Sequence, residues 1–379
     1  MTLVAAIYAE HTPLIITDSL ISQEAAQVNG VTTPLLPQVD MRSGEGYAPV
    51  GLARKFWLLP DGSIFFYSGI SGSARRLFDE VSKHCTTDDK YNQELHSHAL
   101  DYLKRIPGLF SFLVVVPSEK GMTLFTHRET QEELSGYGTV VLLGSGQGAV
   151  KSAMARYDYA NPIDEDSRLL NAYNLAARLT LDYRDSSKRG SEMTASYCGG
   201  YFEVIEPSLY MRESSSLIRG TAHLFFQVSK VGIVLNDFVA SRQGDKETQI
   251  LSAFDLSIHL EGPDFYLDDS LAQEFVLSDD RHCSGLGEQL KGRVPFSHIR
   301  GVILYASMIP ECGKEEHRMQ THTVHVGPNF PAATLIASDE HTNTILVSLF
   351  WDEGDPVKRL ADRLRTQALS CHRCQLRRS

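Results

Sequence analysis

The start of the chain offers a hydroxyl group that could act as a nucleophile. Thr2 stands directly before the apolar run LVAAIY, and cleavage of the Met1–Thr2 bond would give it a free α-amine. A threonine hydroxyl needs a base, and its own α-amino group, with a reference pKa of about 7.7–8.0, can take the proton. Thr2 is therefore a candidate catalytic nucleophile, although Met-Thr is also an ordinary way for a protein to begin.

Several short motifs follow Thr2 in a fixed order. Asp18 ends the second apolar run, PLIIT, and Lys55 opens the apolar hairpin that ends at Gly69. Gly144-Ser145-Gly146 follows the strand-like TVVLL. Asp185 comes after a helical pattern and precedes Gly199-Gly200. No single motif is specific, so their order carries the information.

This ordered set resembles the proteasome β-subunit superfamily of N-terminal nucleophile hydrolases, which includes the bacterial proteasome-like (Anbu-type) proteins. The resemblance covers residues 2–206. It departs from the family at Leu3, where a second threonine is usual, and through insertions at residues 23–50 and 186–197.

The resemblance assigns a role to each of these positions. It implies a threonine-type peptidase or amidohydrolase that needs no cofactor and no metal. The implied catalytic residues are Thr2, Asp18, Lys55, Gly69, Ser145 and Asp185, and the implied substrate-binding residues are Ser22, Ala53, Trp57 and Tyr67. With Tyr67 as floor and Trp57 as wall, the pocket should be shallow and should favour Ala, Ser or Gly on the acyl side of the cut bond.

The implied roles agree with simple electrostatics. An ammonium on Lys55 beside the terminal amine would lower the pKa of that amine and favour its basic form. Asp18 would hold Lys55 in place and keep it charged. The backbone N–H of Gly69 would face the developing oxyanion, a contact worth about 10²–10³ in rate in other enzymes. Without catalysis, Asp18 and Lys55 would form an ordinary salt bridge.

The pattern of the first half predicts an α+β fold. Apolar strand candidates occur in pairs, Pro60-Asp61-Gly62 predicts a hairpin turn, and residues 23–52 have the composition of a long loop. Helical periodicity covers residues 71–84, 90–104, 147–157 and 169–183. Because the helices also come in pairs, we expect a four-layer αββα sandwich of two antiparallel sheets.

The second half has a different character. We predict one domain at residues 1–207 and a second, mostly β domain of unknown role at residues 208–379. Its strand candidates are HLFFQVS, VGIVL, LSAFDLSIHL, GVILYAS, ATLIAS and TILVSLFW. A helix at residues 355–370 closes this domain, because Asp355-Pro356 is a helix-start signal before an apolar stripe.

Composition narrows the choice of partners and compartment. The net charge is −11, with a pI near 5.7, which argues against nucleic-acid binding as the main role. No apolar run approaches the roughly 20 residues of a membrane span. The six cysteines are scattered, which fits a reduced cytoplasm. The family resemblance adds a peptide or unfolded protein as substrate, an ATP-dependent unfoldase as a partner to test, and a homo-oligomer.

Three other interpretations compete with this one. The glycines at 144, 146 and 148 suggest a dinucleotide site, but they give G-x-G-x-G, and no strand ending in an acidic residue follows at the expected distance. Cys371 and Cys374 could be half of a zinc site. Its further ligands would come from Cys312, His317, His322 and His325. The third alternative is a catalytically inactive proteasome-like scaffold or peptide-binding protein.

Overall fold

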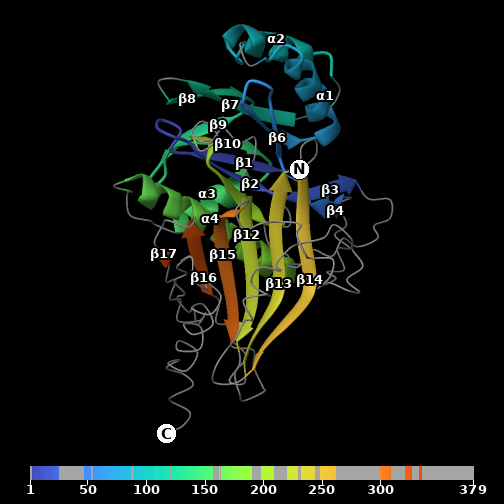
Figure 1. The fold of residues 1–379 in the computed structure, drawn as a ribbon. Coiled ribbons are helices and arrows are strands. Elements are labelled where there is room, and N and C mark those ends of the chain that lie inside the picture. The colour runs from blue at the N-terminus through green and yellow to red at the C-terminus, as the bar shows by residue number, and fades with distance from the viewer. Residues whose placement is uncertain are drawn as a thin grey trace. The chain divides into compact units, whose positions relative to one another are not determined.

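The computed structural model divides the chain into two compact units, Met1–Ile218 and Arg219–Ser379 (Figure 1). The structure describes residues 2–24, 47–52, 54–86, 89–106, 108, 110–118, 121–156, 162, 164–189, 198–208, 220–228, 232–243, 248–261, 299–308, 321–326 and 333–334.

Two antiparallel sheets form the centre of the first unit. One has the strand order β11-β2-β1-β10-β9 and the other the order β5-β6-β7-β8. The strands of the first sheet are β1 (Leu3–Ile7), β2 (Leu14–Asp18), β9 (Thr130–Leu134), β10 (Gly138–Gly144) and β11 (Phe202–Ile205). Those of the second are β5 (Phe56–Leu58), β6 (Ile64–Gly69), β7 (Phe110–Ser118) and β8 (Gly121–His127).

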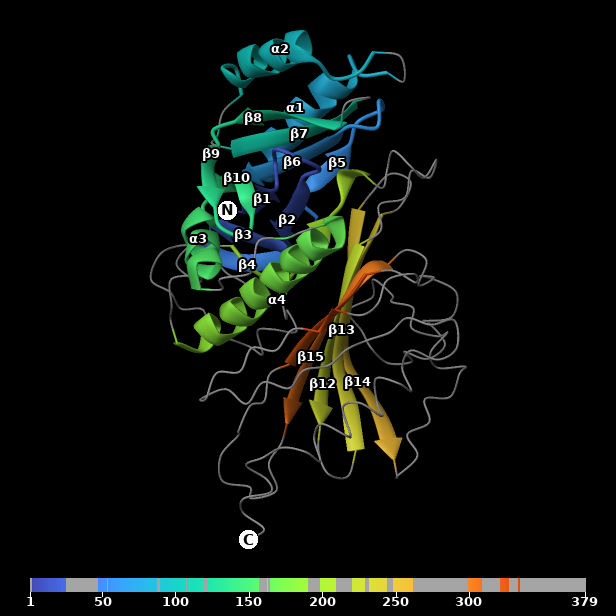
Figure 2. The same ribbon diagram turned by 90° about the vertical axis from the view of Figure 1, so that its left-hand side faces the viewer.

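Two pairs of helices cover the outer faces of these sheets (Figures 1 and 2). Helices α1 (Ser71–Ser82) and α2 (Gln93–Leu103) pack on β6, β7 and β8. Helices α3 (Gln147–Arg156) and α4 (Glu165–Arg189) pack on β2, β10 and β11. The layers run helix, sheet, sheet, helix, so the predicted αββα sandwich is confirmed.

Strand alternation separates two apolar cores. The core between the sheets includes Val4, Phe56, Phe66 and Leu143. The core under α1 and α2 includes Tyr67, with Trp57 packed against it. Successive side chains of a strand point to opposite faces, so Phe56 faces the core between the sheets and Trp57 faces the core under α1 and α2.

The structure corrects two predictions in the first unit. The segment predicted as a loop at residues 23–52 contains strand at both ends, because β3 (Leu20–Glu24) pairs antiparallel with β4 (Tyr47–Leu52). The helix predicted to end at residue 183 continues to Arg189, so Asp185 lies within α4 and not after it. Strand β9, whose sequence TQEEL is polar, was not predicted at all.

The described part of the second unit is a six-stranded sheet with the order β14-β13-β12-β15-β16-β17. Its strands are β12 (Gly220–Val228), β13 (Gly232–Gln243), β14 (Thr248–Glu261), β15 (Ile299–Met308), β16 (Thr321–Val326) and β17 (Ala333–Thr334). Strands β12 and β15 pair in parallel, and the other neighbours are antiparallel. The predicted helix at residues 355–370 and the strand candidate TILVSLFW lie outside the described residues. Among the described helices, none is long and apolar enough to cross a membrane.

Candidate functional site

Thr2 lies buried at the start of β1, against the end of β6. The backbone N–H of Gly69 donates a hydrogen bond to Thr2 Oγ1 at 3.2 Å. The hydroxyl of Ser68 donates to the backbone oxygen of Thr2 at 3.1 Å. Gly69 has a φ of 111°, in the region that favours glycine, and this conformation sends its N–H toward Thr2. The threonine hydroxyl therefore sits within reach of a backbone donor.

Gly144 explains why the Gly-Ser-Gly motif needs its first glycine. A Cβ at Gly144 would lie 1.9 Å from the backbone oxygen of Thr2 and 2.0 Å from Ser68 Oγ, and its φ is +92°. Only glycine therefore lets β10 approach the N-terminal residue this closely. The register pairs Leu3 with Gly144, which brings Ser145 beside Thr2 along the ladder. Ser145 is exposed.

Asp18 ties three segments together at the end of β2. Its Oδ1 accepts the N–H of Leu3 at 2.8 Å, and its Oδ2 accepts the N–H of Gly199 at 3.1 Å. The residue is 1% exposed, and burial raises the pKa of its carboxyl group. The charge of Lys55 and the two N–H donors act in the opposite direction. Asp18 thus fixes the residue that follows Thr2.

Lys55 is a buried residue near Asp18. Its Nζ donates to the backbone oxygen of Leu20 at 2.6 Å. Burial lowers the pKa of Lys55, and the charge of Asp18 opposes that shift. Among the contacts described for these residues, Lys55 and Asp18 act on each other through space and make no direct ion pair. A lysine with a lowered pKa suits proton transfer better than an exposed one.

Tyr67 and Trp57 form an aromatic pair beside Lys55. Their rings stack at 4.2 Å between centroids, with planes 11° apart. Tyr67 is 4% exposed, its hydroxyl donates to the backbone oxygen of Arg54 at 3.4 Å, and its N–H donates to the backbone oxygen of Lys55. Burial raises the pKa of Tyr67, so its phenol stays protonated. The predicted floor and wall of the pocket therefore touch each other.

The remaining predicted residues are only partly described. Ser22 lies on β3, where it pairs with Pro49, and the backbone of Asp185 lies within α4. The side chains of both residues, and all of Ala53, lie outside the description. The structure thus gathers Thr2, Asp18, Lys55 and Gly69 at one end of the sandwich.

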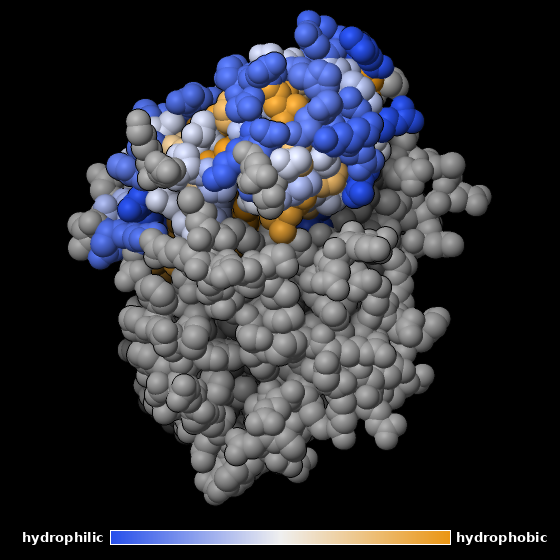
Figure 3. Space-filling model, turned by 45° about the horizontal axis from the view of Figure 1, so that its top comes forward, coloured by the Kyte–Doolittle hydropathy of each residue, from blue (hydrophilic) through white to orange (hydrophobic). Residues whose placement is uncertain are grey.

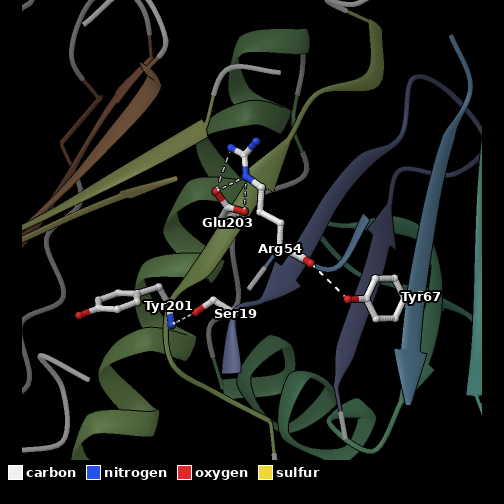
Figure 4. A network of polar contacts seen from close by, with 5 residues as sticks. All are labelled: Ser19, Arg54, Tyr67, Tyr201 and Glu203. Atoms are coloured by element: carbon white, nitrogen blue, oxygen red, sulfur yellow. Dashed lines mark hydrogen bonds and ion pairs between the residues drawn. The ribbon is translucent and has the colours of Figure 1, made fainter. Parts of the chain in front are cut away.

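Sequence reasoning missed a polar network next to this group. Arg54 Nε and Nη2 donate to the carboxylate of Glu203 on β11 at 3.2–3.3 Å (Figure 4). Ser19 Oγ accepts the N–H of Tyr201 at 2.8 Å (Figure 4). The available signal was Glu203, a lone carboxylate within the otherwise apolar strand FEVI. These contacts join the segment before β5 and the end of β2 to β11.

The structure bears on two of the competing interpretations, the dinucleotide site and the zinc site. Gly144 ends β10, which pairs antiparallel with β1 and β9, so the first unit lacks the parallel strand–helix–strand setting of a dinucleotide site there. Of the proposed zinc ligands, His322 and His325 lie on β16, and Cys312, His317, Cys371 and Cys374 are outside the described residues. The two cysteines that the structure describes, Cys85 and Cys198, are free and buried.

Comparisons with known proteins match this chain to solved structures only, and at low similarity. No known family's profile matches this chain, and no curated protein matches it. Among solved structures, a mutant Anbu protein from Hyphomicrobium sp. strain MC1 is 13% identical, with a TM-score of 0.33 over 54% of this chain and 81% of that one. Anbu from Pseudomonas aeruginosa, solved as a helical assembly, is 11% identical, with a TM-score of 0.34 over 53% and 79%.

A third solved structure is HslV from Trypanosoma brucei, which is 12% identical, with a TM-score of 0.30 over 53% of this chain and 97% of that one. These neighbours are proteasome-type proteins, as the sequence resemblance suggested. At TM-scores this low, the likeness carries no conclusion about activity, and the chain's own strands and helices define its fold class.

Proposed function

We propose that the first unit is an N-terminal nucleophile hydrolase that cleaves peptide bonds with Thr2. The observation that carries the proposal is the hydrogen bond from the Gly69 N–H to Thr2 Oγ1. The next residue, Leu3, is held by the buried Asp18, whose charge acts on the buried Lys55. Buried charged groups with shifted pKa values gather more often at functional sites than elsewhere. The proposal requires that the Met1–Thr2 bond is cut, so that the α-amine of Thr2 is free.

The reaction then proceeds in two halves. Thr2 Oγ1 attacks the carbonyl carbon of the substrate while the free α-amine of Thr2 takes the hydroxyl proton. The Gly69 N–H donates to the oxyanion of the tetrahedral intermediate. The substrate amine leaves with that proton, and an ester to Thr2 remains. Water, deprotonated by the same α-amine, hydrolyses the ester and restores the hydroxyl group.

Lys55 would tune this reaction by its charge. An ammonium close to the α-amine of Thr2 favours the uncharged, basic form of that amine. Asp18 would keep Lys55 protonated in spite of its burial, and it would also hold Leu3 through a hydrogen bond. We further propose peptides or unfolded proteins as substrates. We propose a homo-oligomer as well, because an enclosed site would keep an unselective peptidase from folded proteins.

One observation favours a second candidate, a non-catalytic scaffold. Both oxygens of Asp18 accept backbone N–H groups, and Lys55 Nζ donates to a backbone carbonyl. Each residue therefore has a structural task that would remain in an inactive protein. In that case, the same contacts would serve only to join β1, β2 and the segment before β5.

The experiment that separates the two candidates begins with the mature N-terminus. Intact mass gives the fraction of protein that starts at Thr2, and that fraction is assayed with fluorogenic peptides carrying Ala at the cleaved bond. Thr2→Ala should abolish turnover and Thr2→Ser should keep part of it. Thr12→Ala, in the turn between β1 and β2, serves as the matched control and should change nothing. Equal turnover in Thr2→Ala and the unmutated protein would end the proposal.

A further inference from the structure

Three side chains with metal-binding atoms meet where α1 and α2 pack together. Glu80 lies in the last turn of α1, His84 follows that helix, and His98 lies on α2. One oxygen or nitrogen from each of the three lies within 4.8 Å of the others. This cluster is separate from the site around Thr2. In the view of Figure 3, hydrophilic residues cover much of the described surface.

The spacing of these atoms is close to the spacing of ligands that share one metal ion. Glu80 Oε1 lies 3.5 Å from His98 Nε2 and 3.7 Å from His84 Nε2. Both distances exceed the usual hydrogen-bond range of about 2.7–3.2 Å. Ligands at about 2.0–2.1 Å from a tetrahedral zinc ion are separated by about 3.3–3.5 Å. The same carboxylate oxygen therefore sits nearly where a shared ion would need it.

The second carboxylate oxygen of Glu80 is held by another residue. Lys83 Nζ contacts Oε2 at 2.7 Å, which leaves Oε1 to face the two imidazoles. Lys83 thus orients the carboxylate but also places a positive charge near the cation, so its removal should strengthen cation binding.

The type of ligand selects the type of ion. Two imidazole nitrogens and one carboxylate suit zinc and its neighbours in the first transition series, whereas magnesium and calcium prefer oxygen ligands. The imidazoles come from different segments, with ring centroids 5.1 Å apart. About half of each histidine side chain is exposed, so an ion can enter from solvent.

We propose that Glu80, His84 and His98 form a zinc-class metal site that clamps α1 to α2. Three protein ligands bind the ion, and water completes the tetrahedron. The bound ion links the end of α1 to the middle of α2 and stabilises the folded state by mass action. The metal site is independent of the proposed peptidase activity, so the failure of one proposal leaves the other standing.

The test uses the full chain, stripped of metal, and reads each histidine separately. Diethyl pyrocarbonate labels accessible imidazoles, and peptide mass spectrometry reports the labelling at His84, His98 and His11 during a zinc titration. His11 is an internal control, because it lies 3.8 Å from Glu10 as a simple histidine–glutamate pair. In zinc, His84 and His98 should become protected from labelling together, whereas His11 should stay labelled. In magnesium, none of the three histidines should become protected.

Variants show whether the protection of His84 and His98 from labelling is caused by one shared ion. Glu80→Gln should weaken the protection of both histidines by at least about tenfold in zinc concentration. His98→Gln should weaken the protection of His84 to a similar extent, and Lys83→Met should shift the midpoint to lower zinc. Continued protection of His96, which is buried in the folded protein, shows that each variant is folded. Equal labelling of His84 and His98 with and without excess zinc, or equal protection of His11, would overturn the proposal.

Discussion

Arg54 and Lys55 are neighbours in the sequence and both are buried, yet they have different partners. Arg54, 2% exposed, makes three contacts of 3.2–3.3 Å with the carboxylate of Glu203 and lies over the ring of Phe56. Lys55, 4% exposed, makes one hydrogen bond to a carbonyl group, and the carboxylate that acts on it, Asp18, is not in direct contact.

The difference indicates that one buried charge stabilises the fold and that the other can take part in catalysis. A guanidinium matched to a carboxylate is a satisfied pair, and breaking it leaves an uncompensated charge. The charge of a buried lysine that has no carboxylate in direct contact is not cancelled locally, so it can still act on a neighbouring amine. We expect Arg54 to matter for stability and Lys55 for activity.

The largest effect should come from Lys55→Met. In the proposed mechanism, removal of the ammonium takes away the charge that would tune the α-amine of Thr2, so we expect turnover to fall by about 10²–10⁴-fold. The free energy of unfolding should change less than in Arg54→Met, because Asp18 keeps two backbone donors. Peptide turnover and urea unfolding on the same preparation measure both quantities. Full activity in Lys55→Met would remove the distinction between the two cations.

The next effect concerns Arg54 and Glu203. Arg54→Met or Glu203→Gln should lower the free energy of unfolding by about 3–5 kcal/mol, because each removes one side of a buried charge pair. The double variant should lose less than the sum of the two single changes. Turnover per folded molecule should stay close to normal at a temperature where the variants are folded. A specific loss of turnover with normal stability would place Arg54 in the catalytic machinery.

A smaller effect is expected at Tyr67, whose backbone N–H donates to the backbone oxygen of Lys55. Tyr67→Ala, like the more drastic Tyr67→Gly, should open the space beside Trp57 and shift the preference from Ala toward Leu or Phe on the acyl side of the cut bond. The shift should be about 10–200-fold in relative kcat/KM, the range for pockets that gain or lose apolar volume. Tyr67→Phe is the matched control and should keep the small preference. A profile led by Phe or Arg in the unmutated protein would show that Tyr67 does not line the pocket.

The smallest expected effect is a pH dependence of the free energy of unfolding, caused by His96, a buried group that stays neutral. Burial lowers the pKa of His96 below its usual value of about 6.5, and its Nδ1 lies 3.1 Å from the hydroxyl of Tyr91. As pH falls below about 6.5, the unfolded chain takes up a proton that the folded protein resists. The free energy of unfolding should therefore fall, by at most about 1.4 kcal/mol per pH unit.

His96→Gln should flatten this slope between pH 7 and pH 5. Part of the slope should remain in His96→Gln, because burial also lowers the pKa of His127. Urea unfolding at several pH values gives the slope. An identical slope in His96→Gln would show that His96 is not held neutral in the folded protein.

Local patterns were enough to predict much of the first unit. The hairpin around residues 59–63 closes with reciprocal backbone contacts between Leu59 and its neighbours Gly62 and Ser63, as its Pro-Asp-Gly turn predicted. The pairs of apolar strands and the pairs of helices also appear where alternation and helical spacing placed them. These signals are read within a few residues, so they need no knowledge of the rest of the chain.

Features that depend on distant partners were missed. The pairing of β3 with β4 joins segments of polar or Pro- and Gly-rich sequence, and β9 is a polar strand that exists because β10 lies beside it. Glu203 appeared as an irregularity in an apolar strand, because its partner Arg54 lies 149 residues away. The position of Asp185 was misjudged because α4 continues past the point where its apolar spacing weakens.

The most direct test of the central claim is a covalent label on Thr2. A β-lactone inhibitor acylates a nucleophilic hydroxyl by ring opening, so the adduct adds the full mass of the lactone and has no leaving group. In protein shown by intact mass to begin at Thr2, we predict one adduct per chain, mapped to Thr2 by peptide fragmentation and formed more slowly in Lys55→Met. An unlabelled Thr2 in that same protein, with the label absent or on another residue, would contradict the account.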